Sequence, residues 1–196
     1  MANPVYNVRD TGRNSARTGD VREMAENMVH SWTSVTTGTI AVTADTNTDV
    51  SFTHPADTII RNLIAIPAGN IVTAGASGDD VDFDLGTSAG GGQIIDQKAI
   101  LDDGGSAVTW SANAPLYIIQ NSHGHAANQF VSTSTTAGVV GGPATSEAIV
   151  IAGTLYTASA RTLHARLTPL ANDLATAATT VTYLVEFLHM GTTPDQ

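Results

Sequence analysis

The sequence predicts an all-β protein: an antiparallel β-sandwich of jelly-roll-like type, preceded by an extended N-terminal arm and one short helix. Three observations predict this class. Residues with strong β preference or turn chemistry, chiefly Thr, Val, Ile, Gly, Asn and Asp, recur in short blocks. Eight or more short strand-like runs follow one another without alternating helices. No internal repeat of about twenty to fifty residues is visible, which argues against a propeller or a solenoid.

The length of 196 residues suits one well-packed domain with an extension of about twenty to forty residues. We expect residues 1–35 to form the arm and the short helix. Residues 36–196 are expected to form the sandwich domain.

The arm is distinguished by its charge. Residues 1–22 carry four arginines against two aspartates, a balance of +2, whereas residues 23–196 carry four basic residues against sixteen acidic ones, a balance of −12. Polar sequence with no apolar periodicity cannot bury enough surface to fold alone, so we expect the arm to order only on a partner. The candidate partner-binding residues are its four arginines, Arg9, Arg13, Arg17 and Arg22.

A short amphipathic helix is expected at about residues 21–31. Asp20 and Glu23 have the spacing of a capping box, and apolar residues then recur at helical spacing. These apolar residues would form a stripe along one side of the helix. The stripe could pack on the sandwich or on a neighbouring subunit, and both alternatives stay open. Its candidate interface residues are Met24, Met28 and, as an extension, Trp32.

The first strands of the sandwich are expected at residues 39–43, 50–53 and 58–66, with prolines 55 and 67 marking breaks. In the next run, Val81, Phe83 and Leu85 alternate with Asp80, Asp82 and Asp84. This alternation predicts a half-buried strand with one acidic face.

The middle of the chain is less regular. Residues 94–101 fit either a strand or a helical turn, and residues 107–110 and 116–120 fit another strand pair. Residues 121–146 form a long polar segment in which Phe130 and Val131 are the main candidates for a brief strand. We expect this segment to be an exposed or interface-forming loop.

The C-terminal third shows the clearest patterns, with strands expected at residues 148–156, 161–168 and 179–189. In the last of these, Val181, Tyr183 and Val185 lie on one face, and the opposite face is also largely apolar. That strand should therefore be central in its sheet or covered by another subunit.

Composition excludes several classes of function. The net charge of −10, with a single lysine, Lys98, argues against nucleic acid binding over the whole surface. The absence of cysteine excludes a disulfide framework, a thiolate zinc site and a cysteine nucleophile. We expect no membrane partner, because there is no apolar run of about twenty residues, and no signal peptide, because the first thirty residues lack an apolar core.

One motif resembles a hydrolase nucleophile elbow. Gly86-Thr87-Ser88-Ala89-Gly90 matches G-x-S-x-G and follows a predicted strand. An elbow must lead directly into a helix, yet two more glycines come next. The sequence therefore favours a hairpin loop.

Two clusters contain residue types that can bind metal ions. Asp80, Asp82 and Asp84 begin like a calcium loop, but Leu85 stands where glycine is required and a glycine stands at the position of the bidentate glutamate. A solvated acidic face is the expected outcome, with a cation or a basic partner left open.

The second cluster is formed by His123 and His125, which lie in the polar loop without identifiable further ligands. His164 and His189 lie in strand patterns, as packing or hydrogen-bonding residues. No phosphate loop, zinc helix or dinucleotide fingerprint is present, so we predict no metal, no cofactor and no enzymatic activity.

The sequence resembles the capsid decoration, or cement, proteins of tailed phages. The features that carry the resemblance are the basic, glycine-interrupted arm, the Thr/Ala/Gly/Val-rich body with DFDLGTS at residues 82–88, and the closing strand at residues 179–190. It is a resemblance of overall style over most of residues 1–190.

The resemblance implies a jelly-roll-like domain, commonly trimeric, that binds the major capsid protein on the outer shell surface and stabilises contacts between capsomers. The chain would be made in the host cytoplasm and would reside on the virion surface. Two alternatives stay open: a receptor- or carbohydrate-binding appendage that uses the 121–146 loop, and a tail, fibre-base or minor head component.

Overall fold

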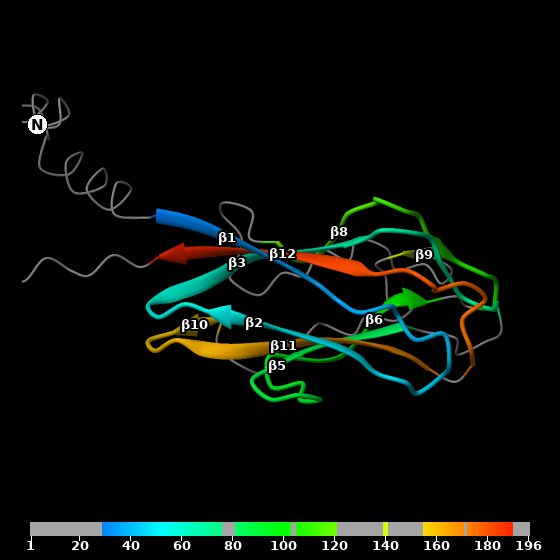
Figure 1. The fold of residues 1–196 in the computed structure, drawn as a ribbon, viewed down its shortest axis with the longest axis horizontal. Helices are drawn as coiled ribbons and strands as arrows, with labels where there is room; N and C mark the ends of the chain where they lie inside the picture. The colour runs from blue at the N-terminus through cyan, green and yellow to red at the C-terminus, as the bar shows by residue number, and fades with distance from the viewer. Residues whose placement is uncertain are drawn as a thin grey trace, which may run out of the picture.

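The computed structural model describes residues 29–75, 81–102, 105–120, 139–140, 155–170 and 172–189, which form β-strands and no helix (Figure 1). No helix of this part of the chain is long and apolar enough to cross a membrane. The strands, in chain order, are β1 (Val29–Thr36), β2 (Thr48–His54), β3 (Thr58–Pro67), β4 (Ile71–Val72), β5 (Val81–Gly86), β6 (Ile95–Asp102), β7 (Thr109–Trp110), β8 (Leu116–Gln120), β9 (Val139–Val140), β10 (Tyr156–Thr157), β11 (Arg161–Pro169) and β12 (Val181–His189).

Two five-stranded antiparallel sheets pack face to face as a sandwich (Figure 1). In the first, sheet A, the order is β1-β12-β3, and both β8 and β10 pair with the remaining edge of β3. In the second, sheet B, the order is β2-β11-β5-β6-β9. β4 and β7 form a separate two-stranded sheet.

The strand pairs are nested along the chain. β1 pairs with β12, β2 with β11, β3 with β8, and β5 with β6. This is the pattern of one long antiparallel hairpin that has been rolled up, and the contacts of β12 with β3 and of β11 with β5 join the pairs into two sheets. Eight main strands in this arrangement form a jelly roll, so the predicted all-β, jelly-roll-like sandwich is confirmed.

The core lies between the sheets and is built mainly by alternation along the strands. In β12, Val181, Tyr183 and Val185 are fully buried, and in β11 Leu163 and Leu167 face them from sheet B. Each fully buried aliphatic or aromatic side chain contributes roughly 1.5–3 kcal/mol. The period-two pattern in the sequence therefore fixes which face of each strand turns inward.

Most expected strands of the C-terminal half are confirmed. Residues 161–168 and 179–189 correspond to β11 and β12, and β12 is central in sheet A, between β1 and β3. Residues 94–101 are the strand β6 and not a helical turn. Of the expected strand at 148–156, the described residues include only the end, at β10, while residues 121–138 lie outside them.

The helix expected at about residues 21–31 is wrong at its C-terminal end. Residues 21–28 lie outside the described residues, but residues 29–31 belong to β1. β1 pairs with β12 along its whole length, from Val29 opposite His189 to Thr36 opposite Thr182. This long-range ladder outweighs the local helical spacing, and β1 spans the domain boundary that we expected between residues 35 and 36.

Residues 39–43 form no strand, contrary to expectation. The Ile40 amide donates to the Thr179 carbonyl at 2.7 Å, and the Leu174 amide donates to the Val42 carbonyl at 2.8 Å. The loop before β2 is thus bonded to the loop between β11 and β12, so its backbone groups are satisfied without a ladder.

Two further expectations were wrong. The runs at 107–110 and 116–120 do not pair with each other, because β7 pairs with β4 and β8 pairs with β3. The strand at 81–86 is not half-buried, because all six residues of β5 are buried.

His54 links the two sheets at one end of the core. Its ring stacks on Phe187 of β12 with the centroids 5.3 Å apart, although His54 itself belongs to β2. Arg161 Nε donates to Nδ1 at 3.2 Å, which leaves Nε2 to donate to the Thr58 carbonyl at 3.3 Å. Both ring nitrogens are therefore occupied in the neutral form of the ring.

We predict that this buried histidine makes the protein less stable in mild acid. Burial, reinforced by the charge of Arg161, lowers the pKa of His54 from 6.5 to about 4. Between these pH values the unfolded chain binds a proton that the folded chain does not, so the free energy of unfolding falls as pH falls, by roughly 3 kcal/mol. Urea unfolding from pH 7 to 4 should show a shallower decline for His54→Gln than for the wild type. Identical slopes would contradict the prediction.

Tyr183 provides a second prediction. Its ring lies 5.8 Å from that of Phe83, and its fully buried hydroxyl has no hydrogen-bond partner among the described residues. A buried unpaired polar group costs about 1–3 kcal/mol, so Tyr183→Phe should raise the free energy of unfolding by about 1 kcal/mol. Tyr156→Phe is the control, because that hydroxyl donates to Asp57 and its loss should not stabilise the fold. Destabilisation by Tyr183→Phe in urea melts would show that the hydroxyl is bonded.

Candidate docking faces of the sandwich

The outer face of sheet A exposes large apolar side chains. Trp32 is 55% exposed, Tyr117 42% and Tyr156 41%, and among the described residues only Val42 joins them as an exposed large apolar residue. Half-buried aliphatic side chains lie between these three aromatic residues on the same face. We define the apolar face as the three aromatic residues with Ile59, Ile64, Ile66, Leu184 and Leu188.

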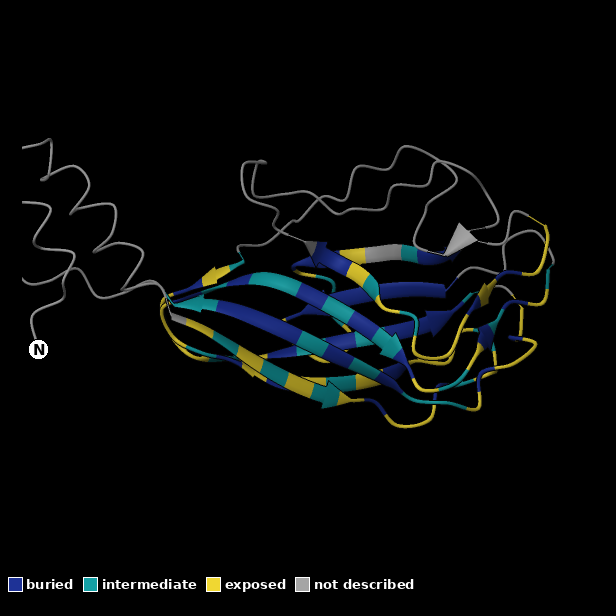
Figure 2. Cartoon of the chain, turned by 90° about the horizontal axis from the view of Figure 1, so that it is seen from above, coloured by how far each residue is buried: buried dark blue, intermediate teal, exposed yellow. Residues whose placement is uncertain are grey.

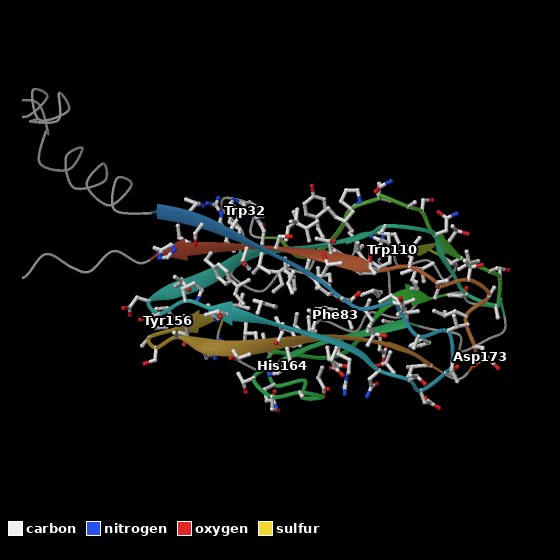
Figure 3. The ribbon with its side chains drawn as sticks, in the orientation of Figure 1. Trp32, Phe83, Trp110, Tyr156, His164 and Asp173 are labelled. Atoms are coloured by element: carbon white, nitrogen blue, oxygen red, sulfur yellow. The ribbon has the colours of Figure 1, made fainter. Side chains whose placement is uncertain are left out.

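Strand register explains why these residues meet. Leu184 of β12 lies opposite Ser34 of β1 and Ile64 of β3, and Ile64 lies opposite Tyr117 of β8. Because their neighbours along each strand turn into the core, these side chains must turn outward. Figure 2 looks onto this side of the molecule, and Trp32 is labelled on β1 in Figure 3.

A buried carboxylate lies within the apolar face. Glu186 points outward from β12 yet is only 7% exposed. Its Oε1 lies 2.6 Å from His30 Nδ1, and its Oε2 accepts a hydrogen bond from Asn62 Nδ2. Arg61 Nη1 lies 3.2 Å from the other ring nitrogen of His30. Both carboxylate oxygens are thus paired, which offsets the cost of their burial.

A β-bulge places these polar residues. The register of β3 against β12 shifts between Glu186 and Phe187, so Arg61 is an extra residue of β3 at that point. In a bulge, two residues of one strand oppose one residue of the other. This is how Arg61 and Asn62, although adjacent in sequence, both reach groups on the outer side.

The outer face of sheet B is polar instead. Arg166 of β11 lies between Asp49 of β2 and Asp84 of β5. Its Nε and Nη2 donate to Asp84 Oδ2 at 3.1 and 2.9 Å. The solvated acidic face expected here is wrong, because Asp84 is 2% exposed and Asp82 6% exposed. The basic partner of Asp84 is the Arg166 guanidinium, so the chain itself supplies it.

The loop between β5 and β6 folds back over this end of sheet B. The Gln93 side chain closes it, with Oε1 accepting from the Thr87 amide at 2.9 Å and Nε2 donating to Ser88 Oγ at 3.0 Å. A Cβ placed on Gly86 would collide with the Gly91 carbonyl and the Gln93 side chain, so only glycine fits beneath the loop. β5 therefore leads through a hairpin into another strand, and the helix required by a nucleophile elbow is absent from this loop.

Most residues singled out from the sequence lie outside the described residues: Arg9, Arg13, Arg17, Arg22, Met24, Met28, Asp80, His123 and His125. Trp32 is described and is the most exposed of the large apolar residues. His189 Nε2 and Ser31 Oγ share a hydrogen bond of 2.7 Å, which agrees with the hydrogen-bonding role expected of this histidine. Within the described ranges, no group of three or more His, Asp or Glu side chains is arranged to hold a metal ion.

Sequence reasoning missed most of the apolar face. Tyr117 and Tyr156 gave no signal of their own, because each lies in a short run without clear alternation. The one visible signal was the apolar second face of residues 179–189, which includes Leu184 and Leu188. Glu186 and His30 are 156 residues apart, a pairing that only the register of β1 and β12 discloses.

Comparison with known proteins yields little. No protein-family model matches the chain, and no curated protein matches it. Among solved structures, a chain of the cyanophage Pam1 capsid asymmetric unit is similar at a TM-score of 0.37 and 16% identity, over 83% of this chain and 84% of that chain. The function proposed below therefore rests on the residues of this chain.

We predict that Gly86→Ala displaces the β5–β6 loop and lowers the free energy of unfolding by about 1–3 kcal/mol, the range for overpacking. Gly38→Ala is the matched control, because a Cβ there meets nothing within 4 Å, and a change within about 0.5 kcal/mol is expected. Urea melts of the two variants make the comparison. Equal stability of both variants would show that the loop does not need glycine at position 86.

Proposed function

We propose that this chain is a non-enzymatic structural protein of a tailed-phage particle, which binds the outer surface of the capsid shell and stabilises contacts between capsomers. Its partner in this role is the major capsid protein, and the arm provides part of the anchor. The role places the protein on the virion surface and requires no cofactor, membrane or nucleic acid.

The observation that carries this proposal is the distribution of charge. Residues 1–22 hold half of the basic residues of the chain and have a balance of +2, against −12 for the remainder. The first described residue, Val29, begins β1, an edge strand of sheet A. A basic arm on an acidic body suits an acidic patch on a partner, and many copies on one shell multiply a modest affinity.

The body is compatible with that role. Jelly rolls recur in viral capsid domains, but also in lectins and cupins, so the fold by itself does not decide the function. The sequence resemblance to decoration proteins includes residues 82–88, which run from the middle of β5 into the loop folded over Gly86. The proposed absence of enzymatic activity is supported by the hairpin context of Ser88, the one nucleophile for which the sequence offered a motif.

A carbohydrate-binding appendage is the second candidate, favoured by the three exposed aromatic residues on sheet A. Trp32 and Tyr117 lie three strand spacings apart, roughly 14 Å; Glu186 and Asn62 follow Trp32 in its row, and Leu184 and Ile64 precede Tyr117 in the next row. Sugar hydroxyls need polar partners, but both oxygens of Glu186 are already paired within the chain, and aliphatic side chains suit the apolar core of a protein interface. The observation thus favours a protein partner.

We predict that deleting residues 1–22 abolishes binding to shells that lack this protein, while the body stays folded. A quadruple variant with Arg9, Arg13, Arg17 and Arg22 replaced by Gln should weaken binding at least tenfold and reduce its dependence on salt. Asp10→Asn is the control within the same segment and should bind at least as well as the wild type. Cosedimentation with purified shells measures binding, and undiminished binding by the truncated chain would overturn the proposal.

A further inference from the structure

The apolar face has the composition of a protein interface. It combines exposed Trp and Tyr side chains with Leu and Ile, residue types typical of the centre of buried interfaces, where charged residues are depleted. Two of its rows carry no charge at all: Ser34, Leu184, Ile64 and Tyr117 form one, and Thr36, Thr182 and Ile66 form the other.

The charges near this face are compensated within it. Glu186 is bonded by His30 and Asn62, and the Arg61 guanidinium lies against His30. On the outer side of sheet B, by contrast, Asp49 and Asp96 are exposed. A cationic partner would be drawn to sheet B, and sheet A offers it no electrostatic advantage.

Charge also decides which surface a second copy can use. Each chain carries −10, so two copies repel each other over most of their surfaces. An apolar face whose few charges are paired within it is the surface on which identical acidic chains can meet at the lowest electrostatic cost. The compensated Glu186 cluster keeps a charged group from opposing its own copy.

The size of the face is sufficient. Four adjacent strands and the nine residues of β12 span about 19 Å by 30 Å, or roughly 550 Å² on each copy. Two copies would bury about 1,100 Å², which clears the roughly 1,000 Å² expected of a biological interface and corresponds to a weak, concentration-dependent association. This planar estimate ignores the relief of Trp32 and Tyr117, which adds contact area.

We propose that the outer face of sheet A is the self-association surface of this protein, on which a second copy packs with Trp32 as an anchor. Sheets stacked in this way lie about 10 Å apart, with their side chains interdigitated. Trp is among the residue types that most often dominate binding energy once they are desolvated, and a second copy packed on the face would desolvate the exposed Trp32. The inference involves neither the arm nor the shell, and so it stands apart from the proposed capsid role.

The test is the oligomeric state of the full chain across a range of concentrations, measured by sedimentation velocity. The wild type should associate, and Trp32→Glu should raise the dissociation constant about thirtyfold or more. Tyr117→Glu, on the far side of the same face, should act in the same direction. The matched control is Thr53→Glu, which places the same charge at an exposed position on β2, the edge strand of sheet B, and should leave association unchanged.

Each outcome decides the matter. A wild type that is monomeric at every concentration overturns the inference. If Trp32→Glu then also loses binding to the shell, the apolar face binds the shell protein and not a second copy. Equal weakening by Thr53→Glu overturns it too, because the effect would be one of net charge. The chain lacking residues 1–22 should still associate, so failure of the arm proposal and failure of this one are separate results.

Discussion

The structure depends on the pairing of β12 with β1 on one side and β3 on the other. This strand is the only connection between the start of the described chain and the rest of sheet A, and its inward residues Tyr183 and Phe187 contact the opposite sheet through Phe83 and His54. Its outward residues Leu184 and Leu188 supply the middle of the apolar face. One nine-residue strand thus serves the sheet, the core and the surface.

Much of the fold could be predicted from local pattern. The alternation in residues 161–168 located β11 and separated its two faces, because a one-residue slip would turn every apolar side chain outward, while the two apolar faces of residues 179–189 located β12 as a central strand. Local pattern failed where long-range bonds decide. Val29 belongs to a strand because β12 lies beside it, and residues 39–43 form a loop because the loop after β11 binds them. The apolar face could not be predicted either, since Trp32, Tyr117 and Tyr156 meet only through strand order.

The two outer faces of the sandwich differ in how they handle charge. On sheet B, Arg166 and Asp84 are withdrawn beneath a glycine-rich loop, while Asp49 stays in solvent. On sheet A, Glu186 is bonded by residues of the two adjacent strands, His30 of β1 and Asn62 of β3, and Arg61 of β3 lies against His30. In both arrangements, polar or basic side chains pair with a buried carboxylate. What remains outside is acidic on one sheet and nearly neutral on the other, which gives an acidic chain two distinct surfaces for two kinds of contact.

The nesting of the strands also has a consequence for biosynthesis. His30 and Glu186 are neighbours in the finished sheet but 156 residues apart in the chain. At about 5–20 residues per second, the ribosome needs on the order of ten to thirty seconds to make the partner of β1 after β1 itself has emerged. During that time β1, which carries Trp32 and Val35, has no native strand to pair with. β1 can therefore form its ladder only after β12 has been made, and until then its backbone groups are open to non-native pairing.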